Sequence, residues 1–343
     1  MRKTSFVLIA ILLTLVLTAQ EQKDSVYHAK IASPGVRFIP VYGGKYNVFT
    51  QKTGNGHNSL LLLSGGPGET HEYFENFPEH LRNANLTVYL YEQLGNYFSD
   101  QPDDSSIWHV DRFVEEVEEV RKGLGIDHFF LLGHSWGGML GTAYAAKYGQ
   151  HLRGLILSNI PGFPANDTNY FFSLMDSMEN VVREKTINFP RFASHRAQVD
   201  SISKGLPIAD TALLISLKKD YRKVNDSLYG RTMYYRKPGK IPDPLARSTR
   251  HYSPPGGGKY NFNIFEVDYA SMMKNIRVPV FLLGSRHDFL HNERYHELKQ
   301  QFANTSVKVY LCPDGAHFPM WDDTANYFRE LSQFISEVSK RKK

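Results

Sequence analysis

Short apolar runs alternate with amphipathic stretches in two parts of the chain, and each run ends in residues typical of turns. Runs of this length are typical of buried strands, which the pattern predicts at 59–66, 86–93, 128–135, 152–159, 278–286 and 307–312. Apolar spacings of three and four predict an amphipathic helix at 110–124, and the chain predicts a second amphipathic helix at 324–338 and further helices at 138–148 and 292–302. This alternation favours an α/β fold in which a mostly parallel sheet carries helices on both faces.

The pattern changes between residues 163 and 261. This segment is rich in Tyr, Arg, Lys, Asp and Ser, has several helical patches, shows no buried-strand pattern and closes with SPPGGG. We therefore expect a helical cap at 163–261, inserted into one core whose two parts are 21–162 and 262–343. Residues 27–50 alternate well enough to predict an antiparallel hairpin at the sheet edge.

The first 20 residues have the layout of a signal peptide. A basic start is followed by an apolar stretch from Phe6 to Leu17 and then by small and polar residues. The apolar stretch is shorter than the roughly 20 residues that span a bilayer, so a cleaved signal is favoured over an anchor. We expect cleavage near Ala19–Glu21 and a periplasmic or secreted protein that has no membrane contact after removal of the signal.

Charge and cysteine content exclude several functions. The net charge of +5 becomes +3 without Arg2 and Lys3, and the basic residues are scattered, so we expect no nucleic-acid partner. Cys312 is the only cysteine, which excludes an internal disulfide, and its strand-like surroundings favour a small buried residue over a nucleophile. Metal-binding and phosphate-loop motifs are absent, so we expect no metal and no cofactor.

Ser135 lies in the motif G-x-S-x-G, at residues 133–137, between a predicted strand and a predicted helix. A nucleophilic serine needs this strained strand-to-helix turn, which lifts its hydroxyl above the sheet, and the small neighbours make the turn possible. The helix behind it favours developing negative charge. A helix N-cap beside packing glycines is the alternative, but the context favours a nucleophile.

A serine nucleophile needs a base and an acid that orients the base, in the chain order Ser, acid, His for this kind of sheet. Asp288 follows the predicted strand 278–286, and His317 lies between the last strand and the last helix. The catalytic triad is therefore predicted as Ser135, Asp288 and His317. Rival residues for the base and the acid are His134, His287, His291, Asp314, Asp322 and Asp323, for which structural roles are favoured.

An oxyanion hole needs two backbone N–H groups aimed at the developing charge. Trp136 directly follows the nucleophile and supplies the first. The second is expected from the loop SGGPG at 64–68, with Gly66 as the donor, because glycine lets the backbone approach a substrate carbonyl.

Several longer motifs resemble the proline iminopeptidase (prolyl aminopeptidase) family of α/β-hydrolases, which includes the tricorn-interacting aminopeptidase. The family's HGGPG loop is similar to SGGPG at 64–68, and its YDQxGxGxS is similar to YEQLGNYFS at 91–99. The stretches GHSWGGML at 133–140 and MYYRKPGKIPDPL at 233–245 also match. The resemblance covers most of 60–160 and, more thinly, 230–320, and it implies the α/β-hydrolase fold.

The resemblance implies that a free N-terminal residue, often proline, enters under the cap, and that the serine forms an acyl-enzyme with it. The family holds the substrate amine with one glutamate near the end of the cap and another directly after the catalytic aspartate. This chain has Phe289 after Asp288 and no acid at 258–263. It also has Ser64 where the family has His, and Glu92 where the family has Asp.

Other carboxylates lie close enough in the sequence to replace the missing pair. Glu266 and Asp268 follow the cap, and Glu69 and Glu72 flank the predicted oxyanion loop. A surface or capping role is the common one for each. Gly65, Glu69 and Glu266 are the predicted substrate-binding residues.

The sequence thus predicts a serine hydrolase that releases an N-terminal residue, preferably proline, from short peptides. The alternative is a carboxylesterase or amidase that uses the same triad on substrates without a free amine. A non-catalytic binding protein is disfavoured by the complete triad in the right order. Acids under the cap facing Ser135 would favour the peptidase, and an apolar lining would favour the esterase.

Overall fold

One eight-stranded sheet forms the centre of the computed structural model, which describes residues 27–162, 168–206, 211–259, 264 and 267–341. Its strands lie in the order β1-β2-β4-β3-β5-β6-β7-β8. Their bounds are Val36–Val41, Tyr46–Thr53, Asn58–Leu63, Leu86–Tyr91, Phe129–His134, Leu152–Ser158, Val280–Ser285 and Val307–Cys312 for β1 to β8. All six strands predicted from apolar runs are therefore confirmed.

The six strands β4, β3, β5, β6, β7 and β8, neighbours in that order in the sheet, run parallel to one another. Strand β2 pairs antiparallel with both β1 and β4. The predicted edge hairpin is confirmed as β1 and β2, but its predicted start is wrong. Residues 27–31 are helical, and the first strand begins only at Val36. Tyr27 stacks on Phe98 at 5.4 Å in this helical turn, so the segment packs against the loop after β4 and not along the sheet edge.

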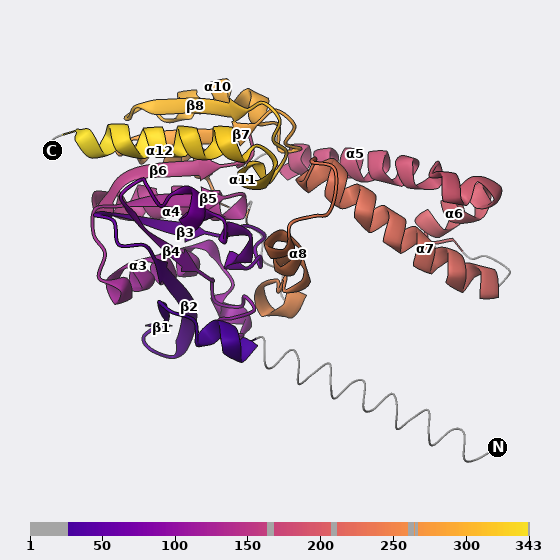
Figure 1. The fold of residues 1–343 in the computed structure, drawn as a ribbon, viewed down its shortest axis with the longest axis horizontal. Coiled ribbons are helices and arrows are strands. Elements are labelled where there is room, and N and C mark those ends of the chain that lie inside the picture. The colour runs from indigo at the N-terminus through magenta and orange to yellow at the C-terminus, as the bar shows by residue number, and fades with distance from the viewer. Residues whose placement is uncertain (1–26, 163–167, 207–210, 260–263, 265–266, 342–343) are drawn as a thin grey trace, which may run out of the picture.

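Helices cover both faces of the sheet, which Figure 1 shows with α12 on one side and α3 on the other. The alternation of side chains along β3 decides the two cores: Leu61 and Leu63 pack with one group, and Leu60 and Leu62 with the other. The first core includes helices α3 (Val110–Leu124), α4 (Trp136–Tyr148) and α9 (Tyr269–Asn275). The second includes α2 (Phe77–His80) and α12 (Thr324–Lys340). The α/β prediction is confirmed.

Most predicted helices match the structure, and one does not. Helix α3 begins at the N-cap His109 and ends at Gly125, whose φ of 67° suits a left-handed C-cap. The predicted helix 292–302 is broken into η7 (Asn292–Arg294), α10 (Tyr295–Leu298) and η8 (Lys299–Gln301). The Asn292 and Tyr295 side chains both donate to the carbonyl of Ile160, which anchors these turns individually at the end of β6.

Four longer helices lie between β6 and β7: α5 (Thr168–Ile187), α6 (Arg196–Ser203), α7 (Thr211–Tyr229) and α8 (Asp243–Arg250). Figure 1 shows α5, α6 and α7 extending away from the sheet and α8 lying beside it. The extended part has a small core of its own, formed by Phe192, Val199, Leu217 and Val224. The limits 163–261 for a cap stay a prediction, because both ends fall on residues outside the described ranges.

Helix α8 is attached to the turn η1 (His71–Phe74), which follows the SGGPG loop. Arg247 Nε pairs with the buried Glu72 at 2.9 Å, and His251 Nδ1 lies 2.7 Å from the other oxygen of Glu72. The Ser253 N–H donates to the Gly68 carbonyl at 2.9 Å. These contacts fix the end of the inserted helices directly above the predicted oxyanion loop.

Three further predictions concern the signal peptide, contact with a membrane and Cys312. The predicted signal peptide, residues 1–20, lies outside the described residues. Among the helices that the structure describes, none has the length and apolar character needed to cross a membrane. Cys312 is buried at the end of β8, and burial raises the pKa of its thiol, so the prediction of a small buried residue is confirmed.

Candidate active site

Ser135 is the single residue between β5 and α4, at the carboxyl edge of the sheet. Its φ of 55° and ψ of −124° are a strained conformation for a residue with a side chain. The turn is this tight because neighbouring backbones touch. A Cβ at Gly137 would stand 2.2 Å from the Leu63 carbonyl oxygen, and one at Gly133 would stand 2.1 Å from the Gly137 carbonyl oxygen. The motif therefore forms the strand-to-helix elbow that the sequence predicts.

The structure brings His317 and Asp288 together at the ends of β8 and β7. His317 Nδ1 lies 3.1 Å from both carboxylate oxygens of Asp288, and both side chains are buried. Because an ionised carboxylate only accepts hydrogen bonds, the proton is on Nδ1 and His317 Nε2 is left as the basic nitrogen.

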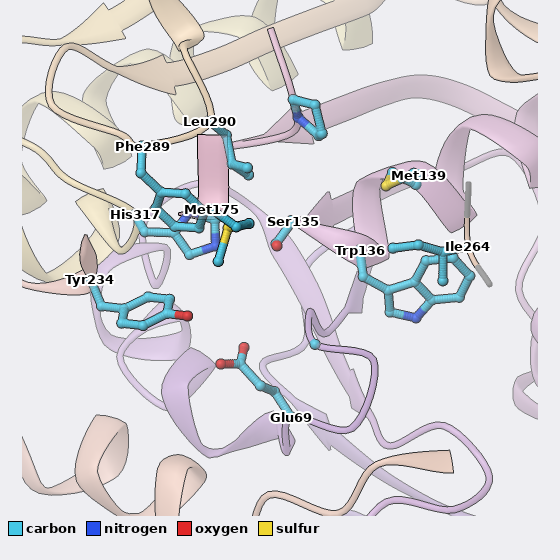
Figure 2. Close-up of a pocket in the computed structure, with 12 residues that line it drawn as sticks. Glu69, Ser135, Trp136, Met139, Met175, Tyr234, Ile264, Phe289, Leu290 and His317 are labelled. Atoms are coloured by element: carbon cyan, nitrogen blue, oxygen red, sulfur yellow. The ribbon is translucent and has the colours of Figure 1, made fainter. Parts of the chain in front are cut away.

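Ser135 and His317 line one pocket of about 180 Å³. Figure 2 shows the Ser135 hydroxyl and the His317 ring facing one another across it. Within the described residues no hydrogen bond joins Ser135 Oγ to His317 Nε2, a contact that in ligand-free enzymes often tightens only when substrate is bound. The arrangement is the one that an activated serine needs, a hydroxyl facing a histidine that is bonded to a carboxylate, but the catalytic roles of the three residues stay a prediction.

Asn159 holds the acid in place, although the sequence analysis did not identify it. It directly follows β6 and has φ of 51°, a left-handed conformation that Asn tolerates. Its Nδ2 donates to Asp288 Oδ2 at 2.6 Å, and the Leu290 N–H donates to Asp288 Oδ1 at 3.0 Å. Each carboxylate oxygen of Asp288 thus accepts a hydrogen bond from a group other than His317.

The predicted oxyanion loop lies beside Ser135. Gly66 lines the pocket and has φ of +107°, and a Cβ there would stand 2.5 Å from the Gly68 nitrogen, so only glycine fits. Trp136 is the first residue of α4, and the first N–H groups of a helix point along its axis out of the N-terminal end, which here lies at Ser135. The geometry therefore suits a carbonyl oxygen held between Gly66 and Trp136, but the role of both residues stays a prediction.

Two buried side chains tie this loop to the elbow. His134 Nε2 lies 2.8 Å from the His317 carbonyl, so this nitrogen carries the ring proton. Nδ1 then accepts from the Tyr73 hydroxyl at 3.2 Å, and the Tyr73 oxygen accepts from the Gly65 N–H at 2.8 Å. Burial, together with nearby His317, holds the pKa of His134 well below its usual range, so the ring is neutral. His134 is structural, as the sequence analysis favours.

Gln93 makes a second link. Its Nε2 donates to the Ser64 carbonyl at 2.9 Å, and its Oε1 accepts from the Trp136 indole at 2.9 Å. Glu92, which replaces the family's Asp, is buried and accepts from the Phe98 N–H at 2.7 Å. Tyr73 and Gln93 went unrecognised from the sequence because each acts across the fold and neither carries a catalytic group.

The rival residues other than His134 are exposed or bonded to other groups. His287 is exposed, and His291 pairs with Glu293. Asp322 accepts from the N–H groups of Ala316 and Arg236, and so supports the segment that carries His317. The other two rivals bond to each other: the Asp314 N–H donates to Asp323 at 3.1 Å.

The pocket in front of Ser135 is mostly apolar. Its apolar lining comes from Trp136, Met139, Met175, Ile264, Phe289 and Leu290. One carboxylate, Glu69, lines it as well, and Figure 2 shows this group pointing into the pocket. Burial raises the pKa of Glu69 to about 7, while nearby His317 acts in the opposite direction.

The structure separates the candidate substrate-binding acids. Glu69 faces Ser135, whereas Glu72 is occupied by Arg247 and His251. Asp268 caps α9 by accepting from the Ser271 N–H. Glu266 lies outside the described residues, so its role stays a prediction.

Gly65, another predicted substrate-binding residue, lies against the nucleophile. A Cβ there would stand 3.0 Å from Ser135 Cβ. Its N–H is occupied by Tyr73, so the residue contributes space beside the serine. Its role in substrate binding also stays a prediction.

Comparisons with known proteins agree with this architecture. The family model described as alpha/beta hydrolase fold matches residues 58–197. The proline iminopeptidase of Elizabethkingia meningoseptica is 32% identical over 312 residues, which cover 86% of this chain and 95% of that protein. The proline iminopeptidase of Chitinophaga pinensis is 31% identical, with 86% and 96% covered.

Solved structures show the same fold. The crystal structure of a Mycobacterium smegmatis proline iminopeptidase has a TM-score of 0.67 at 22% identity and covers 88% of this chain and 98% of that chain. The crystal structure of VinJ has a TM-score of 0.68 at 21% identity and covers 89% and 100%. The solved structures support the fold, and the two relatives above 30% identity establish the family. The chain therefore belongs to the proline iminopeptidase (prolyl aminopeptidase) family of α/β-hydrolases.

Proposed function

We propose that this protein is a serine aminopeptidase that releases the N-terminal residue, preferably proline, from short peptides through an acyl-enzyme. The observation that carries the proposal is that Ser135 and His317 line one small pocket while Asp288 bonds to His317. The proline iminopeptidase relatives, aligned over most of their length, support the substrate class.

The mechanism follows from the positions of these groups. Ser135 Oγ attacks the carbonyl carbon of the N-terminal residue while its proton passes to His317 Nε2. The N–H groups of Gly66 and Trp136 stabilise the oxyanion. His317 then gives the proton to the departing amine, which breaks the peptide bond and leaves an ester on Ser135.

Deacylation uses the same groups in reverse order. A water molecule gives its proton to His317 Nε2 and attacks the ester carbonyl. The proton returns to Ser135 Oγ as the amino acid is released. Asp288 stabilises the imidazolium in both halves without accepting its proton.

The pocket favours one small residue over a long chain. Its volume of about 180 Å³ is below the roughly 300–1,000 Å³ of typical small-molecule sites. Its apolar wall, with Phe289 and Trp136, suits the hydrocarbon ring of proline. The same apolar wall also suits a neutral acyl group, so an esterase is the second candidate.

The test compares Ser135→Ala with Ser105→Ala, a change at an exposed serine. Release of proline from a Pro-Gly-Gly peptide is followed by chromatography, and covalent labelling by a neutral fluorophosphonate is followed by mass spectrometry. Ser135→Ala is expected to lose labelling and about 10⁴-fold or more of the turnover, with no change in Ser105→Ala. Proline release by Ser135→Ala at the wild-type rate would reject the mechanism. Hydrolysis of aryl esters without any proline release would favour the esterase.

We also propose that residues 1–20 export the protein to the periplasm or the medium. The basic start and the short apolar stretch from Phe6 to Leu17 support this. Expression of the full chain in a Gram-negative host should give an extracytoplasmic protein that begins near Glu21. Full-length protein retained in the cytoplasm would contradict the proposal.

A further inference from the structure

Among the described residues that line the pocket of Ser135, Glu69 is the one with an acidic side chain. It lies in the segment between β3 and η1, three residues after Gly66. Figure 2 shows its carboxylate directed into the pocket, below His317 and Ser135 and beside Tyr234. The group therefore faces the space where a substrate carbonyl would bind.

The neighbouring acids have partners, and Glu69 has none within the described residues. Glu72 accepts from Arg247 and Thr70, and Glu92 bonds to His71. No hydrogen bond or ion pair in the described part of the chain uses the Glu69 carboxylate. Charges taken out of water are normally paired, and this one stands against an apolar wall that raises its pKa to about 7. An unpaired carboxylate in such a pocket is a receptor for a cation.

The carboxylate is also at the right distance from the nucleophile. A Cβ on Gly65 would stand 3.0 Å from Ser135 Cβ and 3.2 Å from Glu69 Oε2. The sum of these two distances, about 6.2 Å, is an upper limit on the separation of Ser135 Cβ and Glu69 Oε2. An N-terminal residue places its ammonium nitrogen two bonds from the carbonyl carbon, so one small residue can reach both groups.

We propose that Glu69 binds the α-ammonium group of the substrate, so that the amine subsite lies on the oxyanion loop. This inference rests on the proposed function and names Glu69 as the group that makes the aminopeptidase specific for a free amine. The position after Asp288, where the family resemblance implies a glutamate, is occupied by Phe289, whose ring lies 4.9 Å from the His317 ring. The ligand class is a small primary or secondary ammonium one carbon away from a carbonyl.

The location has a consequence for catalysis. Glu69 and Gly66 belong to the same short loop, and the Glu69 N–H donates to the Gly65 carbonyl at 3.3 Å. A cation held by Glu69 is therefore fixed relative to the oxyanion donor. Recognition of the free amine and positioning of the scissile carbonyl become one binding event.

The test uses two substrates that differ only at the amine: proline 4-nitroanilide and cyclopentanecarboxylic acid 4-nitroanilide. The ratio of their kcat/KM values in one sample does not depend on the folded fraction. The wild-type ratio is expected to be about 100 or more, and Glu69→Gln should lower it by about 100-fold, the size expected for truncating one partner of a desolvated charge pair. Glu79→Gln, a change at an exposed glutamate of α2, should leave the ratio unchanged. An unchanged ratio in Glu69→Gln would overturn the proposal.

A binding measurement separates failure of the subsite from failure of the proposed function. Pyrrolidinium, the cation of proline without its carbonyl, is titrated at pH 8 by ligand-observed NMR. Binding is expected in wild type and in Ser135→Ala and should be lost in Glu69→Gln. If Ser135→Ala still hydrolysed anilides, the proposed mechanism would fail, yet pyrrolidinium loss in Glu69→Gln would still support the subsite. Equal binding by wild type and Glu69→Gln would reject it.

Discussion

Glu69 should lower the stability of the folded protein at the pH where it binds substrate. In the folded chain the pKa of its carboxyl is about 7, whereas in the unfolded chain the pKa has the ordinary value of 4.5. The carboxyl is therefore protonated more readily in the folded chain. Between these two pH values the native state binds more protons than the unfolded state, so stability falls as the pH rises. Replacement by Gln removes the titrating group, and the variant should escape this loss.

The size of the effect follows from the pKa. Above pH 7 the ionised group costs at most about 3.4 kcal/mol, at about 1.36 kcal/mol for each unit of difference between the pKa of about 7 and the ordinary 4.5. Because the side chain keeps some contact with solvent, we expect about 2 kcal/mol. For a chain of this length that corresponds to roughly 3 °C in Tm.

The assay is thermal unfolding of wild type, Glu69→Gln and the control Glu79→Gln, followed by circular dichroism at pH 5, 6, 7 and 8. The Tm of Glu69→Gln should exceed that of wild type by about 3 °C at pH 8 and by much less at pH 5. Glu79→Gln should follow wild type. A Tm difference that stays constant with pH, or a wild type that is more stable at pH 8, would refute the reasoning.

Three further variants test other parts of the site. Asn159→Ala should lower kcat about 10- to 100-fold with little change in KM and weaken the downfield NMR signal of the His317 Nδ1 proton, and a wild-type kcat would count against it. Gly137→Ala should destabilise the fold by about 1–3 kcal/mol in chemical denaturation because its Cβ has no room, so wild-type stability would be inconsistent with the elbow. Arg247→Ala leaves the buried Glu72 with His251 and the Thr70 hydroxyl and should cost about 3 kcal/mol, again read by denaturation; an unchanged midpoint would mean that the Arg247–Glu72 pair is neutral for stability.

The sheet was predictable because its signals are local. Strands buried on both faces read as continuous apolar runs, and the runs at Leu60–Leu63 and Phe129–Leu132 need no partner to be recognised. The elbow was equally local, since a strand, G-x-S-x-G and a helix follow one another directly. Asp288 and His317 could be selected from chain order and from their places after two late strands.

The supporting contacts could not be predicted, because they join residues far apart in the sequence. Asn159 meets Asp288 across 129 positions, and Tyr73 meets His134 across 61. Each is a common polar residue at a position that no periodic pattern marks. Among the candidate acids, only the fold separates Glu69, which faces the pocket, from Glu72, which is consumed by Arg247.

The most direct test of the central claim is the preference for a free amine. Hydrolysis of proline 4-nitroanilide is compared with that of N-acetylproline 4-nitroanilide and a short-chain aryl ester, with Ser135→Ala as the blank. The account predicts rapid turnover of the free-amine anilide, its loss on acetylation and its absence in Ser135→Ala. Turnover of the ester alone, or equal turnover of both anilides, would contradict an aminopeptidase that recognises its substrate through Glu69.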